Sequence, residues 1–358
     1  MVDIPKTMKA VVKSENGYDN MSLKDIPVPE VKDDHVLLKV AYTGICGTDI
    51  HTFKGQYANT RCPIVLGHEF SGEVVAVGDK VSKVKPGDRV TSETTFATCG
   101  HCVYCKAKQY NLCENRRGIG TVQNGSMANY VLTREESVHI LPGNVSYKLA
   151  AMSEPLSCCV HAMYQRTPLN YYDKILIIGP GPMGLLSLQI AKNIGAFVIV
   201  SGVTQDEERL QIAKELGADI VVNSQKEDLN KIVMDATDGV GLTKVYDCSG
   251  ATPAVNQALK LLRKQGEFQQ VGLFAKPMNE IDERTIIQHE ITYRGSRSQN
   301  PYDWPIAVHL ESQGVVNTDK MVTKTFDLEH WRDAFEAMMA GQELKVMIAS
   351  NPDDPDLK

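Results

Sequence analysis

A short apolar run followed by a glycine-rich turn constrains the fold of this chain more than any other feature. The run is Lys174 to Ile178, and it leads directly into a turn at 179–184 with the sequence GPGPMG. A continuously apolar run is typical of a strand buried on both faces, and residues 185–194 carry apolar side chains at helical spacing. This stretch therefore predicts a buried strand, a tight turn and a helix in direct succession.

The same alternation of strand and helix continues to about residue 271. Strands are expected at 197–200, 220–222, 244–246 and 267–271, and helices at 207–216, 227–236 and 253–262. Alternation of this kind is typical of a doubly wound parallel sheet with helices on both faces.

The chain before about residue 150 has a different pattern, which predicts an irregular all-β unit. Short runs rich in β-branched residues stand between proline and glycine at 8–12, 35–42 and 72–77. After Gly295 the alternation stops, and we expect one helix (328–339) and a final strand (345–348), followed by a loose terminus from Asn351. We assign this tail to the all-β unit. The predicted domains are a catalytic β domain (1–155), an inserted dinucleotide-binding domain (156–294) and a return to the catalytic domain (295–358).

Length and composition exclude several classes of protein. The 358 residues exceed one ordinary core, and 42% hydrophobic and 23% charged residues are usual for a globular protein. No apolar run approaches the roughly 18 residues of a membrane-spanning helix, and residues 1–13 lack the apolar stretch of a secretion signal. The net charge of −6 gives no electrostatic footprint for nucleic acid. We therefore expect a cytoplasmic protein with neither a membrane nor a nucleic acid as partner.

Four of the nine cysteines form a compact cluster in the sequence. Cys99, Cys102, Cys105 and Cys113 have the spacing C-x2-C-x2-C-x7-C, which suits a closed tetrahedral zinc site. Tight spacing of this kind also holds iron–sulfur clusters, and a nucleic-acid-binding zinc module is a third possibility that the acidic net charge disfavours. We favour a structural zinc that staples the loop 99–113, with His101 as a bystander.

A second candidate metal site combines residues that lie far apart in the sequence. Cys46, His68, Glu69 and Glu154 offer one thiol, one imidazole and two carboxylates. Each of them alone could be a buried packing residue or a surface charge. In a chain that also binds a dinucleotide, a zinc with mixed ligands and an exchangeable position can act as a Lewis acid on an alcohol or carbonyl oxygen.

The three glycines of the turn have distinct expected roles in dinucleotide binding. Gly179 permits the tight turn, Gly181 lets the backbone approach a pyrophosphate at the helix N-terminus, and Gly184 allows close packing of helix on strand. This context makes a dinucleotide-binding turn a better interpretation than a purely structural one.

The choice between NAD and NADP rests on the end of the second strand. An acid normally stands there to bind the adenosine ribose of NAD, but this strand ends with Ser201 and Gly202. Ser201, Thr204 and Arg209 could accommodate a 2′-phosphate, whereas the acids at 206–208 would repel it. The sequence therefore leans only slightly towards NADP.

These motifs resemble, in the same order along the chain, those of the zinc-dependent medium-chain alcohol dehydrogenases. The shared segments are 44–51, 67–69, 84–90, the four-cysteine loop, 154–156 and the nucleotide turn. Glu154-Pro155-Leu156 stands where many alcohol dehydrogenases have a cysteine, and it is similar to the sorbitol (L-iditol 2-) dehydrogenase branch of polyol dehydrogenases. The segments 304–305 and 344–348 are similar to that branch too.

The resemblance implies a discontinuous GroES-like β catalytic domain with an inserted Rossmann domain, and two zinc ions per chain. Cys46, His68 and Glu69 match ligands of the catalytic zinc, and Glu154 matches a carboxylate that binds the metal or holds its water. Thr48 matches the hydroxyl that contacts the substrate oxygen, and His51 the residue that passes the proton to solvent. The residues expected to contact NAD(P) are Gly179, Gly181, Met183, Gly184, Ser201, Thr204, Arg209, Val271 and Arg297.

The predicted function is oxidation of a secondary hydroxyl of a polyol or sugar alcohol to a ketose, with hydride transfer to NAD(P). A homodimer or homotetramer is implied by the family. One alternative is a threonine- or sugar-phosphate-type medium-chain dehydrogenase, to which the segment 117–120 is similar. A second alternative is a non-catalytic NAD(P)-binding sensor module.

Overall fold

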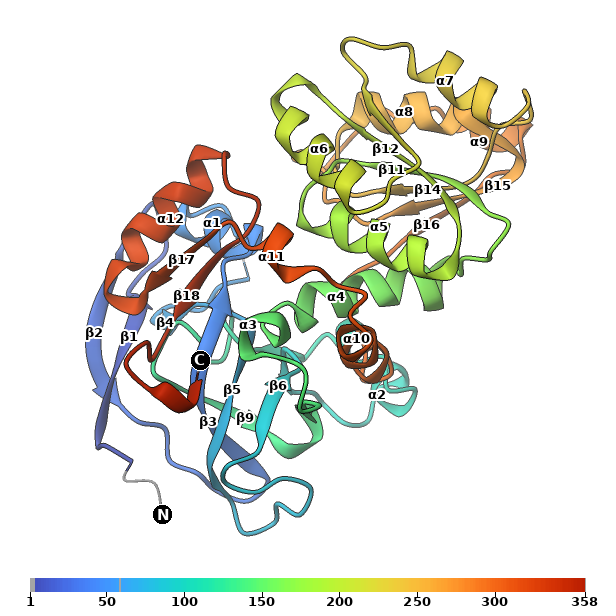
Figure 1. The fold of residues 1–358 in the computed structure, drawn as a ribbon. Coiled ribbons are helices and arrows are strands. Elements are labelled where there is room, and N and C mark those ends of the chain that lie inside the picture. The colour runs from blue at the N-terminus through green and yellow to red at the C-terminus, as the bar shows by residue number, and fades with distance from the viewer. Residues whose placement is uncertain (1–3, 58, 358) are drawn as a thin grey trace. The chain divides into compact units, whose positions relative to one another are not determined.

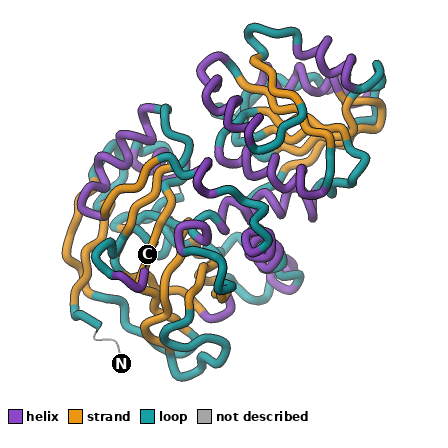
Figure 2. Tube along the Cα trace, viewed as in Figure 1, coloured by secondary structure: helices purple, strands orange, loops and turns teal. Residues whose placement is uncertain are grey.

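The computed structural model describes residues 4–57 and 59–357, which pack into two compact units (Figure 1). The first, which we call the β unit, runs to Glu154 and takes in Asn300–Gly314 and the chain from Thr318 onward. The second, the α/β unit, consists of Pro155–Gln299 and Val315–Asn317. Figure 2 shows that strands and loops dominate the first unit, whereas helices surround the sheet of the second.

The β unit contains three sheets built from short strands. Its strands are β1 (Thr7–Lys13), β2 (Met21–Pro27), β3 (His35–Gly44), β4 (Ile64–Val65), β5 (Glu69–Val77), β6 (Arg89–Ser92), β7 (Thr95–Ala97), β8 (Arg117–Gly118), β9 (Tyr130–Arg134), β10 (Val138–Ile140), β17 (Lys324–Asp327) and β18 (Val346–Ala349). The sheet orders are β2-β1-β4, β10-β6-β5-β3-β18-β17 with β9 also on β3, and β7-β8.

The helices of the β unit are mostly a single turn or two. They are α1 (Gly47–Phe53), α2 (Val103–Lys106), α3 (Tyr147–Ala150), α10 (Asp303–Ser312), α11 (Thr318–Met321) and α12 (Trp331–Ala340), with 3-10 turns at 110–112, 135–137, 328–330 and 355–357. Helix α4 (Ser153–Val160) follows and continues as a π-helix (His161–Arg166).

One buried cluster joins the beginning and the end of the chain within the β unit. It contains Leu37 of β3, Phe53 of α1, Phe335 of α12 and Ile348 of β18. Strand β18 pairs antiparallel with β3, so that Met347 lies opposite Gly44. The C-terminal segment therefore forms the core beneath the segment that carries Cys46.

The α/β unit is one six-stranded parallel sheet, which confirms the predicted doubly wound fold. The sheet order is β13-β12-β11-β14-β15-β16. The strands are β11 (Lys174–Ile178), β12 (Phe197–Gly202), β13 (Ile220–Asn223), β14 (Leu242–Asp247), β15 (Leu262–Gln270) and β16 (Thr292–Gly295). The helices are α5 (Pro182–Ile194), α6 (Glu207–Glu215), α7 (Leu229–Ala236), α8 (Thr252–Leu261) and α9 (Glu283–Gln288), with a 3-10 turn at 204–206. The strand order reverses beside β11, and ligands bind at such switch points.

The tail holds more regular structure than the sequence predicted. We expected one helix and one strand after Gly295, but α10, α11 and β17 are also present. Trp304 on α10 is fully buried and stacks on His139 with ring centroids 5.4 Å apart. The buried face of this helix includes the acids Asp303 and Glu311, whereas Pro305 and Ile306 lie outside that face, so the sequence shows no apolar stripe that would reveal α10. No helix in the described ranges is long and apolar enough to cross a membrane.

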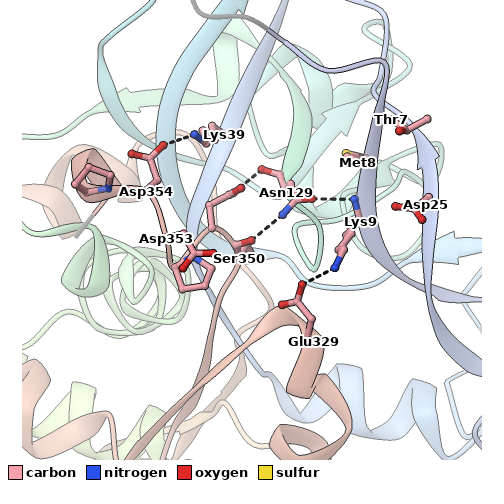
Figure 3. Close-up of a pocket in the computed structure, with 13 residues that line it drawn as sticks. Thr7, Met8, Lys9, Asp25, Lys39, Asn129, Glu329, Ser350, Asp353 and Asp354 are labelled. Atoms are coloured by element: carbon pink, nitrogen blue, oxygen red, sulfur yellow. Dashed lines mark hydrogen bonds and ion pairs between the residues drawn. The ribbon is translucent and has the colours of Figure 1, made fainter.

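The last residues are anchored, so the expectation of a loose terminus is wrong for the part that the structure describes; Lys358 lies outside it. Asn129 donates a side-chain hydrogen bond of 2.8 Å to the carbonyl of Ser350, and Lys39 forms an ion pair with Asp354 (Figure 3). Leu357 is only 3% exposed. These contacts form one wall of a polar pocket of about 650 Å³. The sequence did not predict this packing because the segment is acidic and has few apolar residues.

A buried carboxyl group on α10 makes the stability of the protein sensitive to pH. The Ser153 hydroxyl lies 2.9 and 2.8 Å from the two carboxylate oxygens of Glu311, which is 2% exposed. Burial raises the pKa of Glu311 to about 8. The folded protein therefore keeps this group protonated at a pH where the unfolded chain has ionised it.

Stability should therefore fall as the pH rises from about 5 to about 8, because only the unfolded state releases the Glu311 proton in that window. Glu311→Gln should remove this part of the pH dependence, on the order of a few kcal/mol. Urea unfolding across this pH range measures it, and Glu30→Gln, an exposed acid on the same unit, is the control. An unchanged pH profile in Glu311→Gln would contradict the assignment.

Candidate functional site

Three of the predicted metal ligands come together in the β unit. The ligand atoms of Cys46, His68 and Glu69 all lie within 4.8 Å of one another. Strand pairing explains the meeting, because β3 and β5 are antiparallel with Gly44 opposite Glu69, and Cys46 follows two residues later. His68 and Glu69 are buried, whereas Cys46 is half-buried. The sheet register thus brings residues that are far apart in the sequence into one site.

Glu154 is also buried, and the charges of this cluster affect its pKa. It lies at the start of α4 and is 8% exposed. Burial raises the pKa of Glu154, Glu69 adds to the rise, and His68 and Lys345 oppose it. The tight set of ligand atoms among the described residues does not include Glu154. The structure thus places it close enough to interact electrostatically with the cluster.

A buried aspartate that the sequence analysis missed fixes the positions of two ligand segments. The carboxylate of Asp49 accepts hydrogen bonds from the backbone N–H of Cys46 at 2.9 Å and of Gly67 at 3.2 Å. Its Oδ1 also lies 3.7 Å from Nδ1 of His68. A carboxylate beside a ligating histidine sets the orientation of the ring. An acid three residues after a helix N-cap was the available signal, because that spacing is typical of a capping box.

A buried lysine is the second residue that the sequence analysis did not assign to the site. Lys345 donates a hydrogen bond of 3.1 Å to the carbonyl of Ile45 and forms an ion pair with Glu69. Burial lowers the pKa of Lys345, but Glu69 and Cys46 more than offset this, so its pKa is raised overall. A side chain at Gly44 would overlap the Glu69 carboxylate and the end of Lys345, so glycine leaves room for this ion pair.

The chemistry of this cluster fits a divalent metal ion. A half-buried thiol lies beside several buried carboxyl groups, and buried anions are costly unless a cation accompanies them. Within the described residues, Nδ1 of His68 has no hydrogen-bond partner. Burial lowers the pKa of His68, but Asp49 and Cys46 raise it well above its usual value. Sulfur, nitrogen and oxygen donors in one place are typical of a catalytic zinc site.

The four cysteines of the loop 99–113 form a separate, all-sulfur cluster. The thiols of Cys99, Cys102, Cys105 and Cys113 lie within 4.8 Å of one another. The sulfur atoms of Cys99 and Cys105 are 3.8 Å apart, and a tetrahedral zinc with bonds of about 2.3 Å requires about that separation. Backbone N–H groups of His101 and Cys102 lower the pKa of Cys99 to about 6. His101 lies outside the cluster, and its ring bonds to the Cys99 carbonyl at 2.7 Å.

Helix α1 presents the two predicted proton-transfer residues one turn apart. Thr48 is half-buried, whereas His51 is exposed. Residues three apart on a helix share a face. The Nδ1 atom of His51 lies 3.2 Å from Oε1 of Gln56. This arrangement suits a path from a half-buried hydroxyl to solvent.

A cavity of about 230 Å³ lies at the switch point of the α/β unit. Gly179 and Ser201 line it, together with Gly202, Asp206 and Ser224. Gly179 has a φ of +90°, which glycine adopts without strain. No lysine or arginine is among the described residues that line this cavity.

The other predicted cofactor residues are distributed around this turn. Gly181 caps α5, Met183 and Gly184 lie in its first turn, and a side chain at Gly184 would overlap the carbonyl of Gly179. Val271 directly follows β15 and Arg297 follows β16. Thr204 begins the 3-10 turn after β12, and Arg209 lies in the first turn of α6.

Comparison with known proteins gives consistent matches over almost the whole chain. Residues 32–143 match the alcohol dehydrogenase GroES-like domain, and residues 182–313 match the zinc-binding dehydrogenase domain. A D-arabitol-phosphate dehydrogenase of Enterococcus avium is 64% identical over 98% of this chain and 99% of its own length. A sorbitol dehydrogenase of Halalkalibacterium halodurans is 45% identical over 95% of this chain and 99% of its own length.

A solved structure supports the same conclusion about the fold. A zinc-binding dehydrogenase from Sinorhizobium meliloti, solved bound to NADP, has a TM-score of 0.89 and 31% identity. The match covers 97% of this chain and 100% of the other. The predicted combination of a GroES-like and a Rossmann-type domain is therefore confirmed.

Proposed function

This chain belongs to the zinc-dependent medium-chain alcohol dehydrogenase superfamily, and we propose that it oxidises a secondary hydroxyl of a polyol to a ketone with NAD(P) as hydride acceptor. The observation that carries the proposal is the buried cluster of Cys46, His68 and Glu69 in a chain that keeps the dinucleotide turn. Both curated relatives described above are named as dehydrogenases of sugar alcohols or their phosphates, which supports a polyol as substrate.

Each group of the site has a role in the proposed reaction. Cys46, His68 and Glu69 would hold the zinc, with Glu154 beside it. When bound, zinc acts as a Lewis acid on the substrate oxygen, and the nicotinamide accepts the hydride from carbon. Thr48 would take the hydroxyl proton and His51 would pass it to solvent, so that one hydride and one proton leave the alcohol.

We further propose that the polyol carries a phosphate. The D-arabitol-phosphate dehydrogenase is 64% identical, against 45% for the sorbitol dehydrogenase. A half-buried cation near the cluster suits an anionic substrate. Arg116 donates hydrogen bonds to the hydroxyls of Thr95 at 2.9 Å and Thr94 at 2.6 Å. Burial raises the pKa of Glu154, and the Arg116 guanidinium is among the positive charges that oppose this rise.

A substrate screen tests this proposal. Among D-arabitol phosphates, hexitol phosphates, sorbitol, xylitol and threonine, we expect kcat/KM to be highest for a phosphorylated polyol, by at least about tenfold. Arg116→Gln should lower kcat/KM for that substrate by roughly tenfold and spare the unphosphorylated polyols.

The matched control is Arg117→Gln, because Arg117 is exposed and donates to Gln123 at 2.9 Å. Faster turnover of threonine, or of an unphosphorylated polyol, would contradict a phosphorylated substrate. Nucleotide binding without reduction by any of these compounds would instead favour a non-catalytic sensor.

The lean towards NADP stays a prediction, because an acid lines the cavity and an arginine lies beside that acid. The carboxylate of Asp206 accepts a hydrogen bond from the N–H of Val203 at 3.1 Å, and Asp206 lines the cavity. The guanidinium of Arg209 lies 3.8 Å from this carboxylate. The N–H of Thr204 donates to Gln225. Because Asp206 would repel a 2′-phosphate that Arg209 attracts, we propose that both cofactors are used, with a small preference for NADP.

Removing the charge of Asp206 and removing that of Arg209 should shift the preference between NADP and NAD in opposite directions. Asp206→Asn should raise the ratio of kcat/KM for NADP to that for NAD by roughly tenfold, and Arg209→Gln should lower it by a similar factor. Initial rates with each cofactor measure the ratio. Asp235→Asn, an exposed acid paired with Lys231 on α7, is the control. Equal ratios in all variants would refute the role given to these charges.

We also propose two zinc ions per chain, one at each cluster. Metal analysis should find two equivalents of zinc in the wild type and one in either Cys46→Ser or Cys105→Ser. Cys46→Ser should lose turnover but still bind nucleotide, because the two functions lie in different units. Iron in the fresh protein would establish the iron–sulfur alternative, and full activity in Cys46→Ser would contradict the catalytic assignment.

Oligomeric state and location stay predictions as well. Strand β16 is an edge of the six-stranded sheet, and Leu273, Met278 and Ile287 nearby in the chain are at least 75% exposed. An unpaired edge and exposed apolar residues favour self-association, which supports a homodimer or homotetramer. Light scattering measures the state directly. Thiolate ligands suit a reducing compartment, which supports the cytoplasm, and fractionation of the source cells tests it.

A further inference from the structure

A buried lysine links the two ends of the proposed zinc site. Lys345 is 2% exposed, and its ammonium contacts both the Glu69 carboxylate and the carbonyl of Ile45, the residue before Cys46. Lysine is rarely buried unless it is paired. The Lys345 ammonium therefore contacts the backbone next to Cys46 and the side chain of Glu69.

The backbone holds Lys345 firmly in this place. Its carbonyl accepts hydrogen bonds from the N–H of Thr323 at 2.9 Å and from the Thr323 hydroxyl at 3.2 Å. The next residue, Val346, accepts the N–H of Ile45 at 3.0 Å. The ammonium thus approaches Glu69 from a fixed strand rather than from a mobile loop.

The ion pair limits how Glu69 can bind a metal. Lys345 contacts Oε2 of Glu69, which leaves the other oxygen for the ion. A catalytic zinc keeps three protein ligands and one open position. Two oxygens from Glu69 in addition to Cys46 and His68 would fill that position.

The charge balance of the site also gives Lys345 a role. A thiolate from Cys46 and carboxylates from Glu69 and Glu154 would bring three negative charges to an ion of two positive charges. Lys345 supplies the balancing positive charge from inside the protein. Without it, the surplus of negative charge would weaken the metal as a Lewis acid.

We propose that Lys345 is a positioning residue that restrains Glu69 and so keeps one coordination position of the zinc open. This inference rests on the proposed function, because it needs a zinc at Cys46 and His68. Lys345 touches neither substrate nor cofactor in this role; it acts through Glu69.

Cobalt substituted for the zinc of this site provides a test independent of turnover. In Lys345→Met the released carboxylate should bind through both oxygens. With a solvent molecule still on the metal the coordination number should then rise to five, and the visible cobalt absorption should weaken. With zinc, kcat should fall about 10- to 100-fold, the usual cost of losing a partner of a metal ligand, while the Kd of the nucleotide stays unchanged.

Three further variants separate positioning from general stability. Lys345→Arg should retain the cobalt spectrum of the wild type, because the charge remains. Adding Glu69→Gln to Lys345→Met should restore a four-coordinate spectrum, since the freed carboxylate is gone and no buried charge lacks a partner. Lys13→Met is the matched control, because Lys13 is a buried lysine that donates at 2.8 Å to the carbonyls of Gly17 and Asp19 in the same unit.

The outcomes distinguish this inference from the function on which it rests. A wild type that takes up no metal at Cys46 would refute the proposed function itself. If the wild type binds cobalt and Lys345→Met gives the same spectrum and kcat, the positioning role is refuted while the zinc assignment stands. If Lys345→Met does not fold, the double variant decides, and a spectrum that stays altered in it overturns the role.

Discussion

The pair of hydrogen bonds that Asp49 accepts is the constraint on which the metal site depends. This carboxylate bonds to the N–H of Cys46 and to that of Gly67, so it joins the start of α1 to the loop before His68. The pairing of Gly44 with Glu69 brings these two segments side by side, and the bonds to Asp49 then fix the backbone of Cys46 relative to that of Gly67. A buried carboxylate is stable here because each of its oxygens has a backbone donor. The spacing of sulfur and imidazole is therefore set before any metal binds.

The sheet then brings two more charges to the same point. The register of β3 on β5 places Glu69 opposite Gly44, and the register of β18 on β3 places Lys345 behind it. A one-residue slip in either ladder would turn these side chains to the opposite face. The C-terminal strand is thus part of the site, although it lies almost three hundred residues from Cys46 in the sequence.

Local patterns allowed much of the fold to be predicted, whereas the supporting charges of the site could not be. The parallel sheet and the four-cysteine loop follow from residues close in sequence, so periodicity and spacing revealed them. Asp49 and Lys345 are single charged residues, and such residues usually lie at the surface. The burial of Lys345 depends on the register of β18 on β3, and the burial of Asp49 depends on the packing of α1, for which the capping-box spacing was the one local signal. Helix α10 was missed for a related reason, because its buried face contains the acids Asp303 and Glu311 and so forms no apolar stripe in the sequence.

The two metal clusters differ in a way that follows from their ligands. Four thiols of the loop 99–113 can enclose an ion completely, so that such a site staples the chain and leaves no position for chemistry. The cluster at Cys46 has one thiol and carboxylates, and a carboxylate can bind through one oxygen or two. A carboxylate ligand of this kind needs a neighbouring group that favours binding through one oxygen or through two. The fixed ammonium of Lys345 favours binding of Glu69 through one oxygen. Binding through both oxygens would weaken the buried ion pair between Lys345 and Glu69.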